Sequence, residues 1–274
     1  MLLEQPGAWG ADALTESALP PQVATHLAGF AARLPARVLL LRRTGGAPHP
    51  GAGRSLFVAY SDTDHSWLER FQLDHARDVL DMSLDELTAG RSVGGDPVTD
   101  PLYLVCTNGK HDPCCAEYGL PVARALAETA GDRLWECSHV GGDRFAGNLV
   151  CLPDGVFYGH LDADIARAAV AAHEQRRVLL DAWRGRSPVP FAAQAAEGFV
   201  RRELGIDGLD HLRYLGVERR GAIHHARFAL ARDREVSVEV RETRIGVPRA
   251  LTCAGEPTVA PAFELVGLAD VERL

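Results

Sequence analysis

Five of the six cysteines in this chain gather in one stretch, together with other residue types that bind transition metals. Cys106, Cys114 and Cys115 belong to the segment CTNGKHDPCC, and His139 and Asp143 belong to the later segment SHVGGDRFAG. Thiolates suit zinc and iron–sulfur clusters, and an imidazole replaces a thiolate on one iron of some 2Fe-2S centres. These five side chains are therefore the candidate metal ligands.

Four neighbours of these residues are candidates for contact with a bound cofactor. Gly141 and Gly142 leave room for backbone N–H groups to approach an anion or a sulfide. Lys110 and Arg144 are basic, and a cation beside an iron–sulfur cluster raises its reduction potential. Lys110 is the only lysine among 29 basic residues. Each basic side chain has a simpler alternative role, which is to orient its loop or to contact solvent.

The other three cysteines are expected to pack rather than to react. Cys137 and Cys151 lie in predicted strands beside apolar residues, and Cys253 stands alone near the end of the sequence. Six cysteines in 274 residues are too few for a disulfide scaffold. The opening MLLEQPGAWGADAL has no basic segment and no long apolar run, so we expect a cytoplasmic protein. In that reducing compartment, clustered thiols more often bind metals or take part in redox chemistry.

Alternating strands and helices must position the two loops. The pattern predicts a strand over residues 102–105, an amphipathic helix that runs through Ala130 and closes at Gly131, and a strand over residues 133–137. The segment LVCLPDGVFYGHL predicts two strands joined by a tight turn, and residues 163–183 predict a long helix. The predicted order is β-α-β-β-β-α. Both loops follow strand ends, where ligands bind in α/β sheets.

Two breaks in composition, GGDPVTDP and the predicted linker RGRSPVP, divide the chain into residues 1–96, 97–184 and 185–274. The first region predicts α/β structure, with a helix over residues 21–33. The last region predicts a helix over residues 192–204, followed by β-rich runs around residues 212–218, 225–242 and 250–265. Within these runs, VSVEVRE alternates like a half-buried antiparallel strand. We therefore expect an α/β fold with a small α+β C-terminal appendage.

Charge and motif content exclude several classes of function. The net charge of −8 argues against nucleic-acid binding, which needs a basic surface. No apolar run reaches the roughly 18 residues of a membrane-spanning helix, so we expect no membrane partner. The segment HEQRR lacks the second histidine of a zinc-protease helix, and neither a phosphate-binding loop nor a Gly-x-Ser-x-Gly motif is present.

The two loops also resemble a known family. CTNGKHDPCCAEYG followed by CSHVGGDRFAGNLVCLPDGVFYG is similar to the sucrase/ferredoxin-like family, and the opening EQPGAWGADAL is similar to that family's N-terminal signature. The resemblance covers about residues 1–165 and is most specific in the two loops. It implies that residues 97–184 form a thioredoxin-like domain holding one 2Fe-2S cluster.

Carried over residue by residue, the resemblance implies that Cys106, Cys115 and His139 are ligands. The run CAEYG resembles the C-A-x-x-G pattern of the related ferredoxins, which favours Cys115 over Cys114 as the second thiolate. The fourth position holds Asp143 where eukaryotic-like members have histidine, and an anionic carboxylate lowers the reduction potential relative to imidazole. Cys114 is the alternative fourth ligand, although adjacent cysteines rarely both reach one cluster. Loss of the cluster in this branch is a further alternative.

These observations predict an electron carrier rather than an enzyme. The acidic chain would dock the basic face of a redox partner, either a reductase or an acceptor, and a homodimer is left open. A titratable imidazole ligand would couple electron transfer to a proton. The alternatives are a structural zinc protein and a cluster-free thiol redox protein that uses Cys114 and Cys115. Glycosidase activity needs two carboxylates flanking a sugar, and the sequence singles out no such pair.

Overall fold

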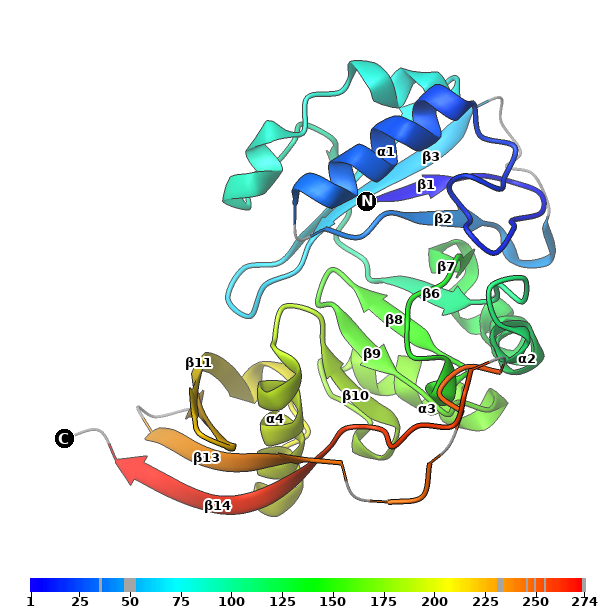
Figure 1. Cartoon of the computed structure of the whole chain (residues 1–274). Coiled ribbons are helices and arrows are strands. Elements are labelled where there is room, and N and C mark those ends of the chain that lie inside the picture. Colours follow the sequence, from blue (N-terminus) through cyan, green and yellow to red (C-terminus); the bar gives the residue numbers. More distant parts are fainter. Residues whose placement is uncertain are drawn as a thin grey trace.

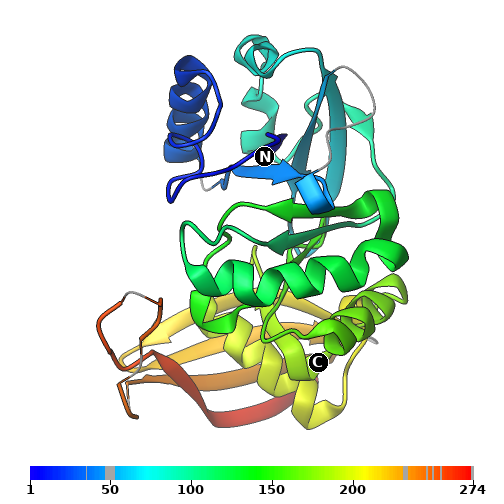
Figure 2. The ribbon, with the colours of Figure 1, turned by 90° about the vertical axis from the view of Figure 1, so that its right-hand side faces the viewer.

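A computed structural model of the chain describes residues 1–34, 36–46, 53–230, 234–244, 246–248, 250–253 and 255–272. Within these residues, ten strands form one mixed sheet and four strands form a second, antiparallel sheet. Helices pack against both sheets (Figures 1 and 2). The predicted α/β fold class is confirmed. In this described part of the chain, no helix combines the length and apolar character needed to cross a membrane.

The segment that carries the candidate ligands forms one half of the large sheet. Its strands lie in the order β9-β8-β6-β7, with β6 and β7 parallel and the other pairs antiparallel. The observed sequence of elements confirms the predicted order β-α-β-β-β-α. These elements are β6 (Leu102–Cys106), α2 (Pro113–Ala130), β7 (Leu134–Cys137), β8 (Leu149–Leu152), β9 (Val156–Tyr158) and α3 (Ala163–Glu174).

The N-terminal segment forms the other half of the sheet with the same strand order. Its elements are β1 (Leu2–Glu4), α1 (Pro21–Arg33), β2 (Leu39–Arg42), β3 (Arg54–Tyr60), β4 (Trp67–Leu73) and β5 (Asp96–Pro97). Strands β1 and β2 are parallel, β3 and β4 follow as an antiparallel pair, and β2 joins β7 of the other half. The chain therefore repeats one topology although its sequence shows no repeat.

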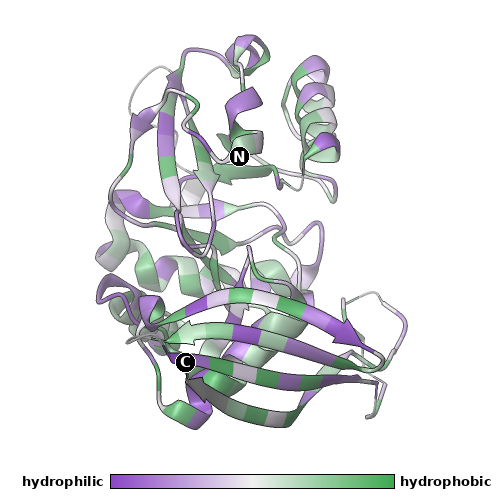
Figure 3. Cartoon of the chain, turned by 90° about the vertical axis from the view of Figure 1, so that its left-hand side faces the viewer, coloured by the Kyte–Doolittle hydropathy of each residue, from purple (hydrophilic) through white to green (hydrophobic). Residues whose placement is uncertain are grey.

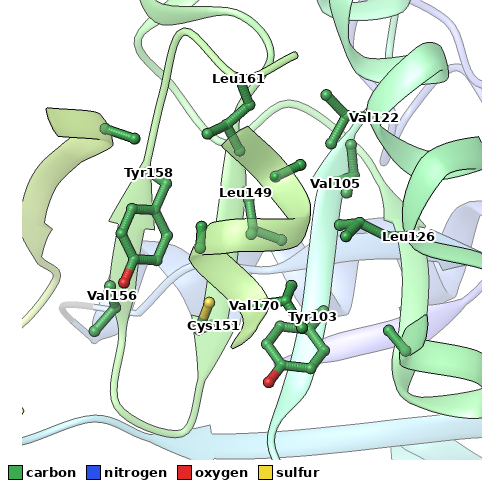
Figure 4. Packing of buried hydrophobic residues seen from close by; sticks show 14 of the residues in the cluster. Tyr103, Val105, Val122, Leu126, Leu149, Cys151, Val156, Tyr158, Leu161 and Val170 are labelled. Atoms are coloured by element: carbon green, nitrogen blue, oxygen red, sulfur yellow. The ribbon is translucent and has the colours of Figure 1, made fainter. Parts of the chain in front are cut away.

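Helices cover the outer faces of the two halves. In the second half, Val122 and Leu126 of α2 and Val170 of α3 pack over Tyr103 and Leu149 of the sheet (Figure 4). This apolar layer holds α2 against β6, the strand that ends in the first candidate ligand. It also confirms that Cys151 is a buried core residue.

The inner faces of the two halves pack against each other. Leu104 and Trp135 of the second half belong to the same apolar cluster as Leu41 and Phe57 of the first. The rings of Phe57 and Trp135 meet edge to face, with centroids 5.7 Å apart. The large sheet therefore curls at the β2–β7 pair, and the N-terminal half supports the strands that carry the candidate ligands.

The long helix predicted over residues 163–183 is wrong, because α3 ends at Glu174. Arg176 adopts a φ of 54°, in the left-handed region that interrupts an α-helix. Its guanidinium bonds Asp154 at 2.8 Å and Asp210 at 2.7 Å. The composition of this segment favours a longer helix, but Arg176 forms ion pairs with distant segments at the position where the chain turns.

The predicted linker from Arg184 is also wrong in its first residues. Strand β10 (Trp183–Arg186) pairs with β9 and forms an edge of the large sheet. Trp183 is buried with its ring 6.4 Å from that of Tyr158. The Arg-Gly-Arg composition does not resemble a strand, and the segment joins the sheet through its tertiary contacts.

Short 3-10 helices occupy Thr44–Gly46, Ala76–Asp81, Asp85–Ala89, Gly131–Arg133, Asp143–Phe145, Leu180–Ala182 and Leu209–His211.

The C-terminal region is an α+β unit. Helix α4 (Phe191–Leu204) packs on a sheet of β11 (Leu212–Arg220), β12 (Ile223–Leu230), β13 (Arg234–Thr243) and β14 (Ala262–Glu272). The predicted half-buried strand is confirmed in β13, where Val236, Val238 and Val240 are buried. Figure 3 shows hydrophilic and hydrophobic residues alternating along these strands. Strand β14 begins at Ala262, later than the run expected from Ala250.

Candidate metal centre

Cys106, Cys115 and His139 converge from three elements. Cys106 is the last residue of β6, Cys115 lies in the first turn of α2, and His139 follows β7 by two residues. Because β6 and β7 are parallel neighbours, their carboxyl ends meet at the same edge of the sheet. One ligand atom from each residue lies within 4.8 Å of the other two. The fold thus brings together three of the predicted ligands.

The start of α2 places Cys115 beside the end of β6. Asp112 caps the helix by accepting a hydrogen bond from the backbone N–H of Cys114 at 3.1 Å, and Pro113 occupies the first helical position. Further along α2, a Cβ atom at Gly119 would overlap the carbonyl oxygen of Cys106. Glycine at this position therefore allows the helix to approach the strand closely.

The two buried thiols have opposite electrostatic character. The pKa of Cys106 lies well below its usual value because Cys115 donates a hydrogen bond to its sulfur, with further bonds from His139 and the backbone N–H groups of Val140 and Asn108. The pKa of Cys115 is raised, first because its thiol donates to Cys106 and then because it is buried. The hydrogen bond therefore favours negative charge on Cys106 over negative charge on Cys115.

Asp143 and His111 extend the group around His139. Asp143 is buried, and its Oδ1 lies 3.1 Å from His139 Nδ1 and 3.6 Å from Cys115 Sγ. The ring of His111 stacks on that of His139 with centroids 3.7 Å apart and planes 15° apart. His111, His139 and Asp143 also form a group of potential ligands within 4.8 Å. The site thus offers thiol, imidazole and carboxylate donors together.

A family model described as sucrase/ferredoxin-like matches residues 9–185. The chain belongs to the sucrase/ferredoxin-like family. The matched range includes both candidate loops and ends within β10. No curated protein and no solved structure matches the chain. The family assignment made from the two loops is therefore confirmed.

In this sucrase/ferredoxin-like protein, Cys114 belongs to a different group of donors from Cys115. Its sulfur lies 2.8 Å from Asp112 Oδ1 and 3.5 Å from the carbonyl oxygen of Asp143. Asp112, Cys114 and Cys253 place one ligand atom each within 4.8 Å of one another. Burial and the neighbouring Asp112 carboxylate raise the pKa of the Cys114 thiol. Asp143 rather than Cys114 thus has its side chain in the group around His139.

The two glycines of the second loop leave space that basic side chains from other elements occupy. Gly141 and Gly142 have φ values of 86° and 76°, in the left-handed region that favours glycine. A side chain at Gly142 would overlap the guanidinium of Arg184, and a Cβ atom at Gly141 would lie 3.4 Å from Arg37 Nη1. The backbone N–H groups that bond the sulfur of Cys106 belong to Val140 and Asn108. The predicted approach of the two glycines to a bound anion or sulfide stays a prediction.

Arg37 and Arg184 add to the basic side chains predicted around the loop. Burial and repulsion from Arg144 and Arg37 lower the pKa of Arg184 to about 10. Arg144 is exposed, and its guanidinium lies 4.5 Å from the ring centre of Phe145. Lys110 is exposed on the first loop.

Sequence reasoning missed three residues beside the site. His111 lies within CTNGKHDPCC, so its position in the loop was a usable signal. Arg37 donates a hydrogen bond to the carbonyl oxygen of Val140, and Arg184 donates to the side chain of Asn148 at 2.7 Å. No local motif marks either arginine, because both reach the loop from other strands or their flanks.

Proposed function

We propose that this protein carries one 2Fe-2S cluster and transfers electrons, with Cys106, Cys115, His139 and Asp143 as the ligands. The observation that carries the proposal is the convergence of two buried thiols and an imidazole within 4.8 Å. Both cysteines are 1% exposed. A mixed thiolate and imidazole set of this kind fits an iron–sulfur cluster. Membership in the sucrase/ferredoxin-like family supports the same assignment.

The proposed fold of the cluster-bearing unit is thioredoxin-like. In support, a parallel βαβ unit (β6, α2, β7) precedes an antiparallel hairpin (β8, β9) and a final helix (α3). Helices α2 and α3 pack on the same face of these strands. The N-terminal half repeats the strand order, and we propose that it is a second unit of this type without the ligand cysteines.

The residues of the chain would prepare the site for a one-electron cofactor. When bound, a 2Fe-2S cluster accepts and releases one electron. The backbone N–H groups that bond Cys106 stabilise negative charge on its sulfur, which raises the reduction potential. Burial of the two cysteines excludes water. The His139 side chain is 20% exposed, which makes it the most exposed of the four proposed ligands.

We propose a redox partner protein that approaches the second loop. Arg37 and Arg144 are exposed beside this loop, and Arg184 lies close to both. A partner that covers them would present carboxylates, although the net charge of −8 favours basic partners for the rest of the surface. The rate of electron transfer to such a partner should fall as salt screens the attraction.

The proposal is tested on the full chain purified without oxygen. We expect a brown protein with iron and acid-labile sulfide in equal amounts, visible charge-transfer absorption and, after reduction, an EPR signal. Cys106→Ala should abolish all of these features. Cys151→Ala, which removes a buried thiol on β8 instead, should keep them. Colourless protein without iron after anaerobic reconstitution would contradict the proposal.

A structural zinc site is the second candidate, because two cysteines, a histidine and an aspartate also form a zinc donor set. Zinc bound in a Cys106-dependent manner, with no colour after reconstitution, would favour it. Thiol redox chemistry between Cys114 and Cys115 has less support, since the two sulfurs lie in different groups of side chains.

A further inference from the structure

A second group of metal-binding side chains lies beside the first. Asp112, Cys114 and Cys253 each offer one ligand atom, and these atoms lie within 4.8 Å of one another. Cys253 comes from the chain between β13 and β14, which reaches the start of α2 (Figure 1). None of the three residues is a ligand of the proposed cluster, so this group needs its own explanation.

The carboxylate of Asp112 holds the two cysteines together. Its Oδ1 lies 2.8 Å from Cys114 Sγ, and its Oδ2 accepts the backbone N–H of Cys253 at 2.7 Å. Asp112 is only 2% exposed. Among the described residues, no basic side chain forms an ion pair with it. A buried carboxylate that faces two thiols without a cationic partner is suited to a bound cation.

The donor types select the cation. Zn²⁺ binds cysteine sulfur and aspartate oxygen in tetrahedral geometry and accepts three protein ligands with water in the fourth position. Hard cations such as Mg²⁺ and Ca²⁺ prefer oxygen ligands throughout. Cys253 is exposed and Cys114 is partly exposed, so an ion can enter from solvent. The two thiols release their protons when the ion binds.

We propose that Asp112, Cys114 and Cys253 form a zinc site that fastens the segment between β13 and β14 to the start of α2. The site ties the C-terminal region to the loop that carries Cys115. Zinc therefore stabilises the contact between a distant part of the chain and the edge of the candidate metal centre. This inference does not depend on the proposed cluster, because it uses different side chains.

The test compares zinc binding by the full chain and by Cys253→Ser, using Zn²⁺ in competition with a chromophoric chelator. We expect Cys253→Ser to lose one equivalent of zinc or to bind it at least about tenfold more weakly. Cys151→Ala is the matched control and should bind zinc like the wild type. Equal stoichiometry and affinity in the wild type and Cys253→Ser would overturn the proposal.

A second measurement identifies the ligands. Co²⁺ added in place of zinc should give thiolate-to-cobalt charge-transfer absorption that weakens in Cys253→Ser. In the Cys106→Ala background, zinc should raise the melting temperature of the protein that keeps Cys253 and not that of the variant with Cys253→Ser. A disulfide between Cys114 and Cys253 in peptide maps of the anaerobically purified protein would overturn the proposal.

One further comparison separates this proposal from the electron-transfer function. In the Cys106→Ala background, which lacks the proposed cluster, adding Cys253→Ser should still remove the same zinc equivalent. This comparison tests the zinc site even if the protein has no iron–sulfur cluster. If Cys253→Ser has no effect in that background, the zinc proposal fails while the cluster proposal stands.

Discussion

Asp143 is the residue that sets this site apart from a ligand set of two cysteines and two histidines. Its carboxylate is buried against His139 and Cys115, where an ionised side chain would add negative charge to the proposed cluster. We predict that Asp143→His, which replaces this anion with a neutral imidazole, raises the reduction potential by about 100 mV or more. A redox titration followed by visible absorption measures the change.

The control for this prediction is the same replacement at an exposed position. Asp85→His lies in a short 3-10 helix of the N-terminal half and should leave the potential unchanged. If Asp143→His binds a cluster whose potential equals that of the wild type, Asp143 does not act on the cluster.

The sequence predicted those residues of the site that lie in or beside the two motif-bearing loops. The two loops that follow neighbouring strands correctly predicted that Cys106, Cys115 and His139 come together. Arg37 and Arg184 were not predictable, since Arg37 reaches Val140 through the pairing of β2 with β7, and Arg184 lies in a strand that resembled a linker. Contacts of this kind depend on strand pairing across the whole chain.

At the scale of elements, the approach of α2 to β6 sets the separation of the two proposed thiolates. Gly119 has no space for a Cβ atom because the carbonyl oxygen of Cys106 occupies that position. We predict that Gly119→Ala forces the helix from the strand, destabilises the fold by about 1–3 kcal/mol and weakens cluster retention. Urea denaturation measures the first effect, and iron content measures the second.

A second helical glycine provides the comparison. Gly198 lies in α4, where an added Cβ atom would meet only the flexible end of Arg202 at 3.1 Å and Trp183 at 3.9 Å. Gly198→Ala should therefore be neutral or slightly stabilising, as expected for alanine in a helix. Equal effects of the two substitutions would show that close packing at Gly119 is not the cause.

The elements themselves were predictable to different degrees. The apolar spacing of residues 21–33 correctly predicted α1, and the Pro-Asp-Gly segment correctly predicted the turn between β8 and β9. The same type of pattern failed after Glu174, because Arg176 turns toward Asp154 and Asp210. Local propensity predicts an element until contacts with distant residues outweigh it.

At the scale of the whole molecule, no sequence pattern indicated how the parts join. The N-terminal half and the half that carries the candidate ligands repeat one strand order, yet they share no motif. Their junction is the pairing of Leu41 and Arg42 with Cys137 and Glu136. Arg42 also donates two hydrogen bonds to Glu136 Oε2, from Nε at 2.9 Å and from Nη2 at 2.8 Å. Pairing of this kind between distant strands can be recognised only from the folded structure.

A buried carboxylate lies at the junction between the two sheets. Glu197 of α4 is fully buried and pairs with Arg201 at 2.9 Å and with Arg186 of β10 at 3.1 Å. Arg186 also donates to the carbonyl oxygen of Leu212 in β11, so the group links the large sheet to the small one.

Because Glu197→Ala leaves two buried guanidinium groups without their carboxylate, we predict a loss of about 3–5 kcal/mol in the free energy of unfolding, measured by urea denaturation. Glu203→Ala, on an exposed position of the same helix, should change it by less than about 0.5 kcal/mol. Equal stabilities of the two variants would mean that apolar packing of α4, rather than this ion group, joins the sheets.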